Sequence, residues 1–145
     1  MSLDIRKATQ NDYMAIIHLL LSNQLPSLDI HSLNIELFVG LHHQEIIATL
    51  GIEKYDDVAL VRSFCVQEAF RSQHIGEAML QYLFQHCQYE NIQSLYLLTT
   101  TAENYFKRYG FKTIERTTVP VVIQQTKEYS SLCPSSAMMM SKKIK

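Results

Sequence analysis

The sequence predicts an α/β fold in which helices flank a mixed, mostly antiparallel β-sheet. In the first half of the chain, three β-prone runs follow one another with only short polar turns between them, which is typical of an antiparallel meander. In the second half, segments with helical periodicity alternate with short apolar runs, which is typical of strands connected through helices. Together the two patterns predict one sheet with helices packed against it.

The N-terminal half is predicted to hold a strand, a helix and the meander. Residues 3–7 form a short strand, and Thr9 with Asp12 three residues later resembles a capping box at the start of a helix. Pro26 ends that helix, and residues 28–33 form a second short helix or a loop. The strands of the meander are predicted over 35–41, 46–54 and 58–66, with turns at 42–45 and 56–57.

The C-terminal half is predicted to alternate helices and strands. Gly110 is expected to end the second of its helices as a C-terminal cap. No repeat, low-complexity tract or linker divides the chain, so residues 1–145 are predicted to form a single domain. The helices are predicted over 75–88, 102–109 and 121–129, and the strands over 95–99, 111–116 and 137–140.

The composition excludes several classes of function. The net charge is −1, so no overall basic field favours nucleic acid or an anionic membrane as a partner. Residues 1–7 are polar where a secretory signal has an apolar core, and no stretch approaches the roughly 20 apolar residues of a transmembrane helix. Cys65, Cys87 and Cys133 are widely spaced, which argues against a disulfide framework and a zinc site. We therefore expect a cytoplasmic protein that holds no metal.

Residues 63–80 carry the most chemical information. A predicted strand ends at Val66, a polar loop follows, and a helix begins near Ile75. The free N–H groups and the positive dipole end of a helix start bind phosphate groups. Gly76 would let a diphosphate approach the backbone, and Arg71 would add a charged contact. A second interpretation also fits, in which Gly76 packs the helix against the sheet and Arg71 is solvated.

Residues 73–78 (QHIGEA) resemble the acetyl-CoA signature of the GNAT acetyltransferases, Q/R-x-x-G-x-G/A, at every specified position. Residues 102–111 are similar to the later cofactor-side helix of that family, and Ser72 and His74 stand where the family commonly has glycine. The resemblance covers nearly the whole chain and implies the GNAT fold with acetyl-CoA as cosubstrate. The cofactor-binding residues that it implies are Phe64, Cys65, Val66, Arg71, Gln73, His74, Ile75, Gly76, Glu77, Ala78, Tyr105, Phe106 and Tyr109.

The resemblance also implies a mechanism. The strand that ends at Val66 would diverge from the strand over 95–99, and the pantetheine arm would lie in the gap beside the backbone of Phe64. The N–H of Val66 would polarise the thioester carbonyl and stabilise its developing negative charge. The amine would attack directly, without a covalent enzyme intermediate. The acid that reprotonates the thiolate is unassigned, because Phe106 occupies the usual tyrosine position and helical geometry is expected to direct Tyr105 and Tyr109 elsewhere.

Two further residues have competing interpretations. Glu53 interrupts the apolar character of its strand, which suits a general base acting through water, but it could equally be an outward-facing strand residue. Arg62 alternates with Leu60 and Phe64 and could bind a substrate carboxylate, whereas an ion pair with Glu53 or Asp57 is the commoner arrangement.

The acceptor is expected to be a small-molecule amine. Residues 95–102 and 128–137 resemble a GNAT subgroup associated with bacterial arsenic-resistance operons, and that narrower resemblance implies a small amino compound as substrate. A homodimer is an expectation at family level. A non-catalytic module that binds acyl-CoA without turnover is the alternative, and Ser72, His74 and Phe106 are the residues in its favour.

Overall fold

The structure is a computed structural model that describes residues 2–27 and 29–145. No helix in this described part is long and apolar enough to cross a bilayer. The strands are β1 (Asp4–Lys7), β2 (Ile35–His42), β3 (Glu45–Tyr55), β4 (Val58–Val66), β5 (Ser94–Thr99), β6 (Lys112–Ile114) and β7 (Met138–Lys143). The helices are α1 (Tyr13–Ser22), α2 (Ile75–Tyr89), α3 (Glu103–Lys107) and α4 (Val121–Gln124), with the shorter turns η1 (Gln10–Asp12), η2 (Glu68–Phe70), η3 (Arg116–Thr118) and the π-helical η4 (Glu128–Leu132).

The seven strands form one sheet in the order β1-β2-β3-β4-β5-β7-β6. Every neighbouring pair is antiparallel except β4 and β5, which run parallel, so the predicted mixed and mostly antiparallel sheet is confirmed. The parallel pair is short, because only Val58–Leu60 of β4 pairs with Ser94–Tyr96 of β5. Beyond these residues the two strands are no longer paired, and this break in the sheet is the feature that positions the candidate site.

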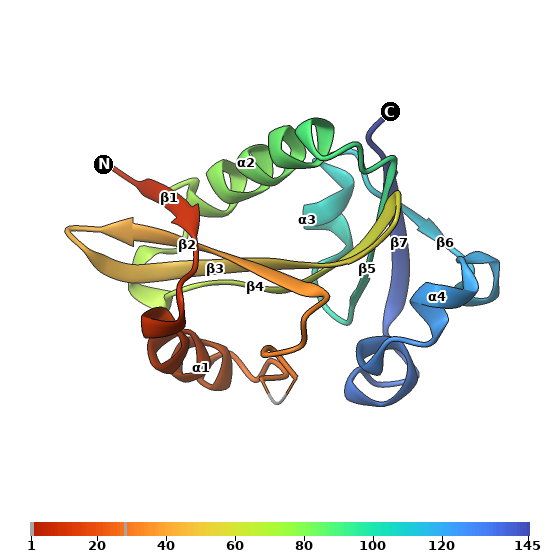
Figure 1. The fold of residues 1–145 in the computed structure, drawn as a ribbon, viewed down its shortest axis with the longest axis horizontal. Helices are drawn as coiled ribbons and strands as arrows, with labels where there is room; N and C mark the ends of the chain where they lie inside the picture. The colour runs from red at the N-terminus through yellow and green to blue at the C-terminus, as the bar shows by residue number, and fades with distance from the viewer. Residues whose placement is uncertain (1, 28) are drawn as a thin grey trace.

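Helices cover both faces of the sheet (Figure 1). The alternation of side chains along β2 divides the core: Phe38 packs in the cluster that contains α2 and α3, whereas Leu37 and Val39 pack against Ile16 and Leu20 of α1. A third cluster places α4 over the far end of the sheet, and its buried members are Leu60, Val119, Ile123 and Met139. The sheet is therefore the shared wall of three apolar clusters.

The predicted meander is confirmed, and β4 has the predicted bounds. The capping box is also present, since the Asp12 carboxylate accepts the Thr9 N–H at 2.7 Å, although it opens the turn η1 ahead of α1. Of the two alternatives predicted for residues 28–33, a short helix or a loop, residues 29–33 form the loop, with turns, and Leu28 lies outside the described residues. Gly110 has the left-handed φ of +97° expected of a C-terminal cap, just after α3.

The predicted helix over 121–129 is interrupted. α4 ends at Gln124, and the π-helical turn η4 begins only at Glu128. Buried Thr126 lies between them, where its hydroxyl donates to the Ile123 carbonyl at 2.8 Å and accepts the Tyr129 N–H at 3.2 Å. A side chain that bonds to the backbone in this way competes with the helical hydrogen-bond ladder. The break matters because it sets the position of Glu128.

Candidate active site

A β-bulge in β4 changes which side chains face each side of the sheet. Arg62 lies opposite Gly51 and Cys65 opposite Thr49, so Ser63 and Phe64 together oppose the single residue between them on β3. Ser63 has a φ of +55°, in the left-handed region. We expected Arg62 and Phe64 to share a face, and that expectation is wrong because the bulge inserts an extra residue between them. Phe64 instead packs in the cluster of α2 and α3, and Cys65 packs toward α1.

A pocket of about 1180 Å³ opens where β4 and β5 stop pairing. Its walls come from β4, the loop before α2, the first turn of α2, α3, the end of β5 and the segment 128–137. The expected site residues that line it are Arg62, Phe64, Val66, Arg71, His74, Ile75, Gly76, Glu77, Tyr105, Phe106 and Tyr109. Four expected residues are not in the lining, namely Glu53, Cys65, Gln73 and Ala78.

The backbone of Val66 is directed into this gap. The N–H of the next residue, Gln67, donates to the Ile47 carbonyl of β3 at 2.7 Å. Because successive N–H groups of a strand point to opposite sides, the N–H and C=O of Val66 point away from β3. The Val66 carbonyl accordingly accepts a bond from Arg71 Nε at 3.2 Å. The Val66 N–H lies on the same side of the strand, toward β5.

The loop before α2 has an unusual backbone. Ser72 and His74 have φ angles of +67° and +64°, in the left-handed region that favours glycine. This conformation explains why glycine suits these positions and shows that Ser72 and His74 still adopt it. α2 then begins at Ile75 and runs for 15 residues, so its first N–H groups and the positive end of its dipole lie in the pocket wall.

Gly76 is in close contact with α3. A Cβ built on Gly76 would collide with the hydroxyl of Tyr105. The Tyr105 ring lies 5.1 Å from the Tyr109 ring, and burial together with Tyr109 raises the pKa of Tyr105 to about 12. We expected Tyr105 and Tyr109 to point away from Phe106, but all three line the pocket. The ring contacts place Tyr105 beside both Tyr109 and Phe106, although Tyr109 follows the end of α3 at Lys107.

Arg62 is the centre of a buried ion-pair cluster. Its Nη1 and Nη2 atoms contact the two oxygens of Asp29 at 2.7 and 2.5 Å, and Nη1 also donates to Glu53 Oε1 at 3.1 Å. The Arg62 side chain has no exposed surface. The ion pair with Glu53 is therefore present, whereas Asp57 is not a partner of Arg62. Burial opposes ionisation of Asp29, but Arg62 outweighs this effect and lowers the pKa of Asp29.

Glu53 belongs to this cluster and lies outside the pocket wall. Its Oε1 accepts the bond from Arg62, and its Oε2 accepts a bond from the hydroxyl of Tyr55. The residue is only 5% exposed. Each carboxylate oxygen thus has a protein donor, and the residue is not part of the pocket lining, so Glu53 does not meet a ligand in the pocket directly.

Glu128 completes the cluster and was missed in the sequence. It is 7% exposed, lines the pocket, and places Oε1 3.7 Å from Arg62 Nη2. Its Oε2 accepts a bond from the Cys133 thiol at 3.1 Å. Burial raises the pKa of Glu128, and burial together with Glu128 raises the pKa of Cys133 to about 12, so Cys133 stays a thiol near neutral pH. No spacing in the sequence could have revealed this carboxylate, because the fold alone brings it to Arg62.

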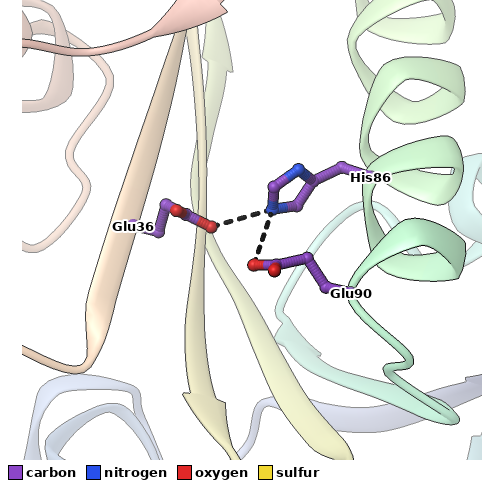
Figure 2. Close-up of side chains that lie close together, drawn as sticks. All are labelled: Glu36, His86 and Glu90. Atoms are coloured by element: carbon purple, nitrogen blue, oxygen red, sulfur yellow. Dashed lines mark hydrogen bonds and ion pairs between the residues drawn. The ribbon is translucent and has the colours of Figure 1, made fainter.

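A second polar cluster lies away from the pocket, between β2 and α2. Glu36, His86 and Glu90 come close together, with His86 Nε2 2.9 Å from Glu36 and 3.4 Å from Glu90 (Figure 2). Lys54 contacts Glu90 at 2.8 Å, and Lys7 contacts Glu36 at 2.9 Å. The charges of the two lysines thus offset those of the two carboxylates, and the resulting ion-pair network links α2 to the sheet.

The sequence matches the family model described as the acetyltransferase (GNAT) domain over residues 34–113. The chain belongs to the GNAT acetyltransferase family. The matched part runs from the meander to the start of β6 and contains the gap, the loop before α2 and α3. The narrower resemblance to an arsenic-resistance subgroup gains no support from the match. No curated protein sequence matches this GNAT chain significantly.

Several solved structures of acetyltransferases share the fold. A GNAT-family acetyltransferase from Staphylococcus aureus Mu50 superposes with a TM-score of 0.81 at 20% identity, over 99% of this chain and 100% of that one. N-acetylglutamate synthase from Neisseria gonorrhoeae, complexed with coenzyme A and N-acetyl-glutamate, gives 0.81 at 15% identity, over 100% of this chain but 36% of the synthase. Ribosomal-protein-S18-alanine N-acetyltransferase from Escherichia coli gives a TM-score of 0.76 at 15% identity, over 99% of this chain and 94% of that one.

Proposed function

We propose that this GNAT chain is an N-acetyltransferase that transfers the acetyl group of acetyl-CoA to the amine of a small molecule. The observation that carries the proposal is the Val66 N–H, which points into the gap where β4 and β5 part. This gap leads directly to the N-terminus of α2. The arrangement supplies one N–H for an acyl carbonyl and a group of N–H donors for a diphosphate, joined by a single pocket. We further propose that residues 1–145 act as one acetyltransferase domain.

The residues of the pocket fit the parts of acetyl-CoA. The loop over Arg71, Ser72 and His74, with the first N–H groups of α2, would hold the diphosphate, and Gly76 gives it room on one side. Phe64 and Val66 of β4 would lie along the pantetheine arm. Gln73 and Ala78 would act by shaping the loop, since the Ala78 N–H closes the first turn of α2 on the His74 carbonyl at 3.2 Å. Acetyl-CoA, when bound, supplies an activated acyl group.

Residues of this chain would then position the two substrates and polarise the thioester carbonyl. The Val66 N–H would donate to the thioester oxygen and stabilise the negative charge that develops on it as the amine attacks. Holding the two bound substrates together in one pocket would supply much of the remaining rate enhancement. Glu53 would act indirectly, by holding Arg62 in place. This account needs no protein nucleophile, consistent with Cys65 packing toward α1 and Cys133 remaining a thiol.

The acceptor is proposed to be a small molecule because two separate segments form walls at its end of the pocket. Residues 24–26 and 132–134 both contribute to the lining there, from segments far apart in the sequence. Among proteins of this fold, the Neisseria synthase is complexed with N-acetyl-glutamate and the Escherichia coli enzyme is named for an alanine of a ribosomal protein. A single fold therefore serves acceptors of very different size, and the lining of each pocket must decide between them.

The proposal is tested by thermal unfolding of the purified protein with acetyl-CoA and with CoA. A ligand at 100 times its dissociation constant stabilises a protein by about 2.7 kcal/mol. We expect saturable stabilisation by both ligands that Gly76→Glu abolishes in a folded sample. The control Gln85→Glu places the same charge on the exposed face of α2 and should respond as the wild type does. No response of the wild type to either ligand would overturn the proposal.

Binding without turnover would support the alternative, a non-catalytic acyl-CoA module. The two are separated by measuring release of free CoA thiol from acetyl-CoA in the presence of amines. An N-acetyltransferase releases CoA in proportion to the acetylated amine formed. A binding module shows the same thermal stabilisation and no amine-dependent release.

A further inference from the structure

One end of the pocket is lined by the charged residues Arg62 and Glu128. Phe64 and Val66 face the side of the sheet that carries α2 and α3, whereas Arg62 faces the side that carries α1 and α4, as Leu60 does. Asp29 from the loop after α1 and Glu128 from η4 both meet Arg62 on that side. If the cofactor lies along α2 and β4, the region around Arg62 and Glu128 is where the acceptor must approach.

Arg62 has no pair of donors left for a ligand. Its two terminal nitrogens donate to the two oxygens of Asp29, and Nη1 also donates to Glu53. The remaining nitrogen, Nε, donates to Ser63 Oγ at 3.3 Å. The remaining N–H of Nη2 faces Glu128. A substrate carboxylate would have to displace one of these buried carboxylates and leave it without its partner, which is costly. The geometry therefore disfavours our expectation that Arg62 binds a substrate carboxylate.

Glu128 has the opposite property. Its Oε2 is occupied by the Cys133 thiol, but its Oε1 has no hydrogen bond among the described residues and lies at a long 3.7 Å from Arg62. The residue is more than nine-tenths buried and is part of the pocket lining. Among the described residues, Gln67 Oε1 is the fully buried side-chain polar atom that lacks a partner, so Glu128 Oε1 keeps some exposed surface and can accept a bond from the pocket. The donor that fits is the N–H of a ligand in the pocket.

The charges around this oxygen favour a cation. Asp29, Glu53 and Glu128 are three carboxyl groups in contact with one guanidinium, so this contact cluster carries an excess of negative charge when they are ionised. Two further cations act on it without contacting the carboxylates, since Lys127 lowers the pKa of Asp29 and Arg116 opposes the rise in the pKa of Cys133. An ammonium group placed beside Glu128 would reduce this excess, whereas a carboxylate would add to it. Like charges brought together in a desolvated site strongly disfavour a ligand.

We propose that the acceptor is a small cationic amine with no carboxylate next to its reacting nitrogen, and that Glu128 binds its ammonium group and removes the proton. This inference rests on the proposed acetyltransferase function and deepens it. It also assigns a base to a residue of η4 that lines the pocket, in place of Glu53, which does not line it.

The reaction balances with these groups. The Glu128 carboxylate takes one proton from the ammonium group, which leaves a neutral amine with a free electron pair. That pair forms the new C–N bond at the acyl carbon while the C–S bond breaks and its electrons leave with the CoA sulfur. The nitrogen loses its second proton as the amide forms. The sulfur gains one proton, and one proton passes to solvent.

The surroundings of Glu128 suit a base. Burial raises its pKa, and the nearby Asp29 and Glu53 carboxylates act in the same direction, while Arg62 and the Cys133 thiol limit the rise. A carboxyl group with a raised pKa accepts a proton more readily than an ordinary one, and general bases work best when their pKa approaches the working pH. The Cys133 thiol holds the carboxylate by its other oxygen and thereby positions it.

The test uses matched acceptors and a binding measurement that does not depend on turnover. Alaninamide and alanine differ only in having a carboxamide or a carboxylate next to the amine, and so do serinamide and serine. We expect the wild type, saturated with CoA, to be stabilised thermally by the amides and not by the amino acids. With acetyl-CoA, it should acetylate the amides with a kcat/KM at least about tenfold higher. Glu128→Gln should lower kcat/KM for the amides by about 100-fold or more and leave the dissociation constant of acetyl-CoA unchanged.

Controls separate this inference from the function on which it rests. Amides have the less basic amine, so the decisive quantity is the amide-to-acid ratio of kcat/KM, which should fall in Glu128→Gln because the charge discrimination is lost. Glu45→Gln removes an exposed carboxylate far from the pocket and should change nothing. If Glu128→Gln is poorly folded, Glu128→Asp keeps the charge and should retain the preference for amides at reduced rate. A wild type that binds acetyl-CoA but prefers the amino acids, or binds neither amine, overturns the inference and leaves the acetyl-CoA site standing.

Discussion

Arg62 and Asp29 form a two-pronged ion pair that joins the middle of the sheet to the loop after α1, with Nη1–Oδ2 and Nη2–Oδ1 distances of 2.7 and 2.5 Å. The pair is 33 residues apart in the sequence and almost completely buried. It holds Arg62, which lines the pocket, and takes one N–H from each of its two terminal nitrogens. The stability of the fold and the charge of the proposed acceptor end therefore depend on the same contact.

Replacing Arg62 should destabilise the protein strongly. Arg62→Leu leaves Asp29, Glu53 and Glu128 buried without a cation, and we expect the free energy of unfolding to fall by about 3–5 kcal/mol. The buried carboxyl groups would then have folded pKa values above their unfolded ones, so the loss should be smaller at pH 5 than at pH 8. Urea unfolding at both pH values measures this. Arg108→Leu, at an exposed position, is the control, and an equal loss in both variants would contradict the account.

The contact between Gly76 and Tyr105 predicts a coupling between two mutations. Alanine is normally preferred over glycine in a helix by about 1 kcal/mol. Because a Cβ at position 76 would collide with the Tyr105 hydroxyl, we expect Gly76→Ala to destabilise the wild type by about 1 kcal/mol. In a Tyr105→Phe background the same change should be neutral or stabilising. Chemical unfolding of the four proteins gives the coupling energy, and a Tyr109→Phe background, which should show none, is the control.

The left-handed backbone at His74 predicts a stabilising substitution. A non-glycine residue in this conformation costs about 1 kcal/mol, so His74→Gly should raise the free energy of unfolding by about 0.5–1 kcal/mol. The identical change at His18, inside α1, should lower it by about 1 kcal/mol. Thermal unfolding of the two variants distinguishes them. Destabilisation by His74→Gly would mean that the imidazole makes a contribution that outweighs the backbone strain.

These cases show which features the sequence could predict. The meander, α2 and the cap at Gly110 follow from local patterns, namely alternation, helical periodicity and a glycine in the right place. The bulge at Ser63 was not predictable, because the residues around it continue an ordinary alternation and only the register against β3 reveals the extra residue. Glu128 was missed for a similar reason, since Thr126 breaks a helix that local periodicity predicts to be continuous. The fold was therefore accessible from the sequence, whereas the acceptor end of the site was not.

The capping box predicts a pH dependence of stability. The bond to Arg6, with the bonds to Thr9, lowers the pKa of Asp12 to about 2, below the value of about 3.9 for an unfolded aspartate. A group whose pKa is lowered by folding stabilises the protein above its unfolded pKa, and this contribution is lost as the pH falls toward its folded pKa. We expect Asp12→Asn to reduce stability by about 1 kcal/mol at pH 7. The difference from the wild type should shrink between about pH 4 and pH 2. A difference that stays constant over this range would contradict the assignment.

The most direct measurement is the amide resonance of Val66, followed by NMR while the protein is titrated with acetyl-CoA and separately with CoA. The central claim is that this N–H lies in the gap between β4 and β5 and donates to the thioester oxygen. It predicts that both ligands shift the resonances of the loop before α2, whereas only acetyl-CoA, which carries the acyl oxygen, shifts the Val66 proton downfield as a new hydrogen bond forms. Saturable binding of acetyl-CoA that leaves the Val66 amide unchanged would contradict it.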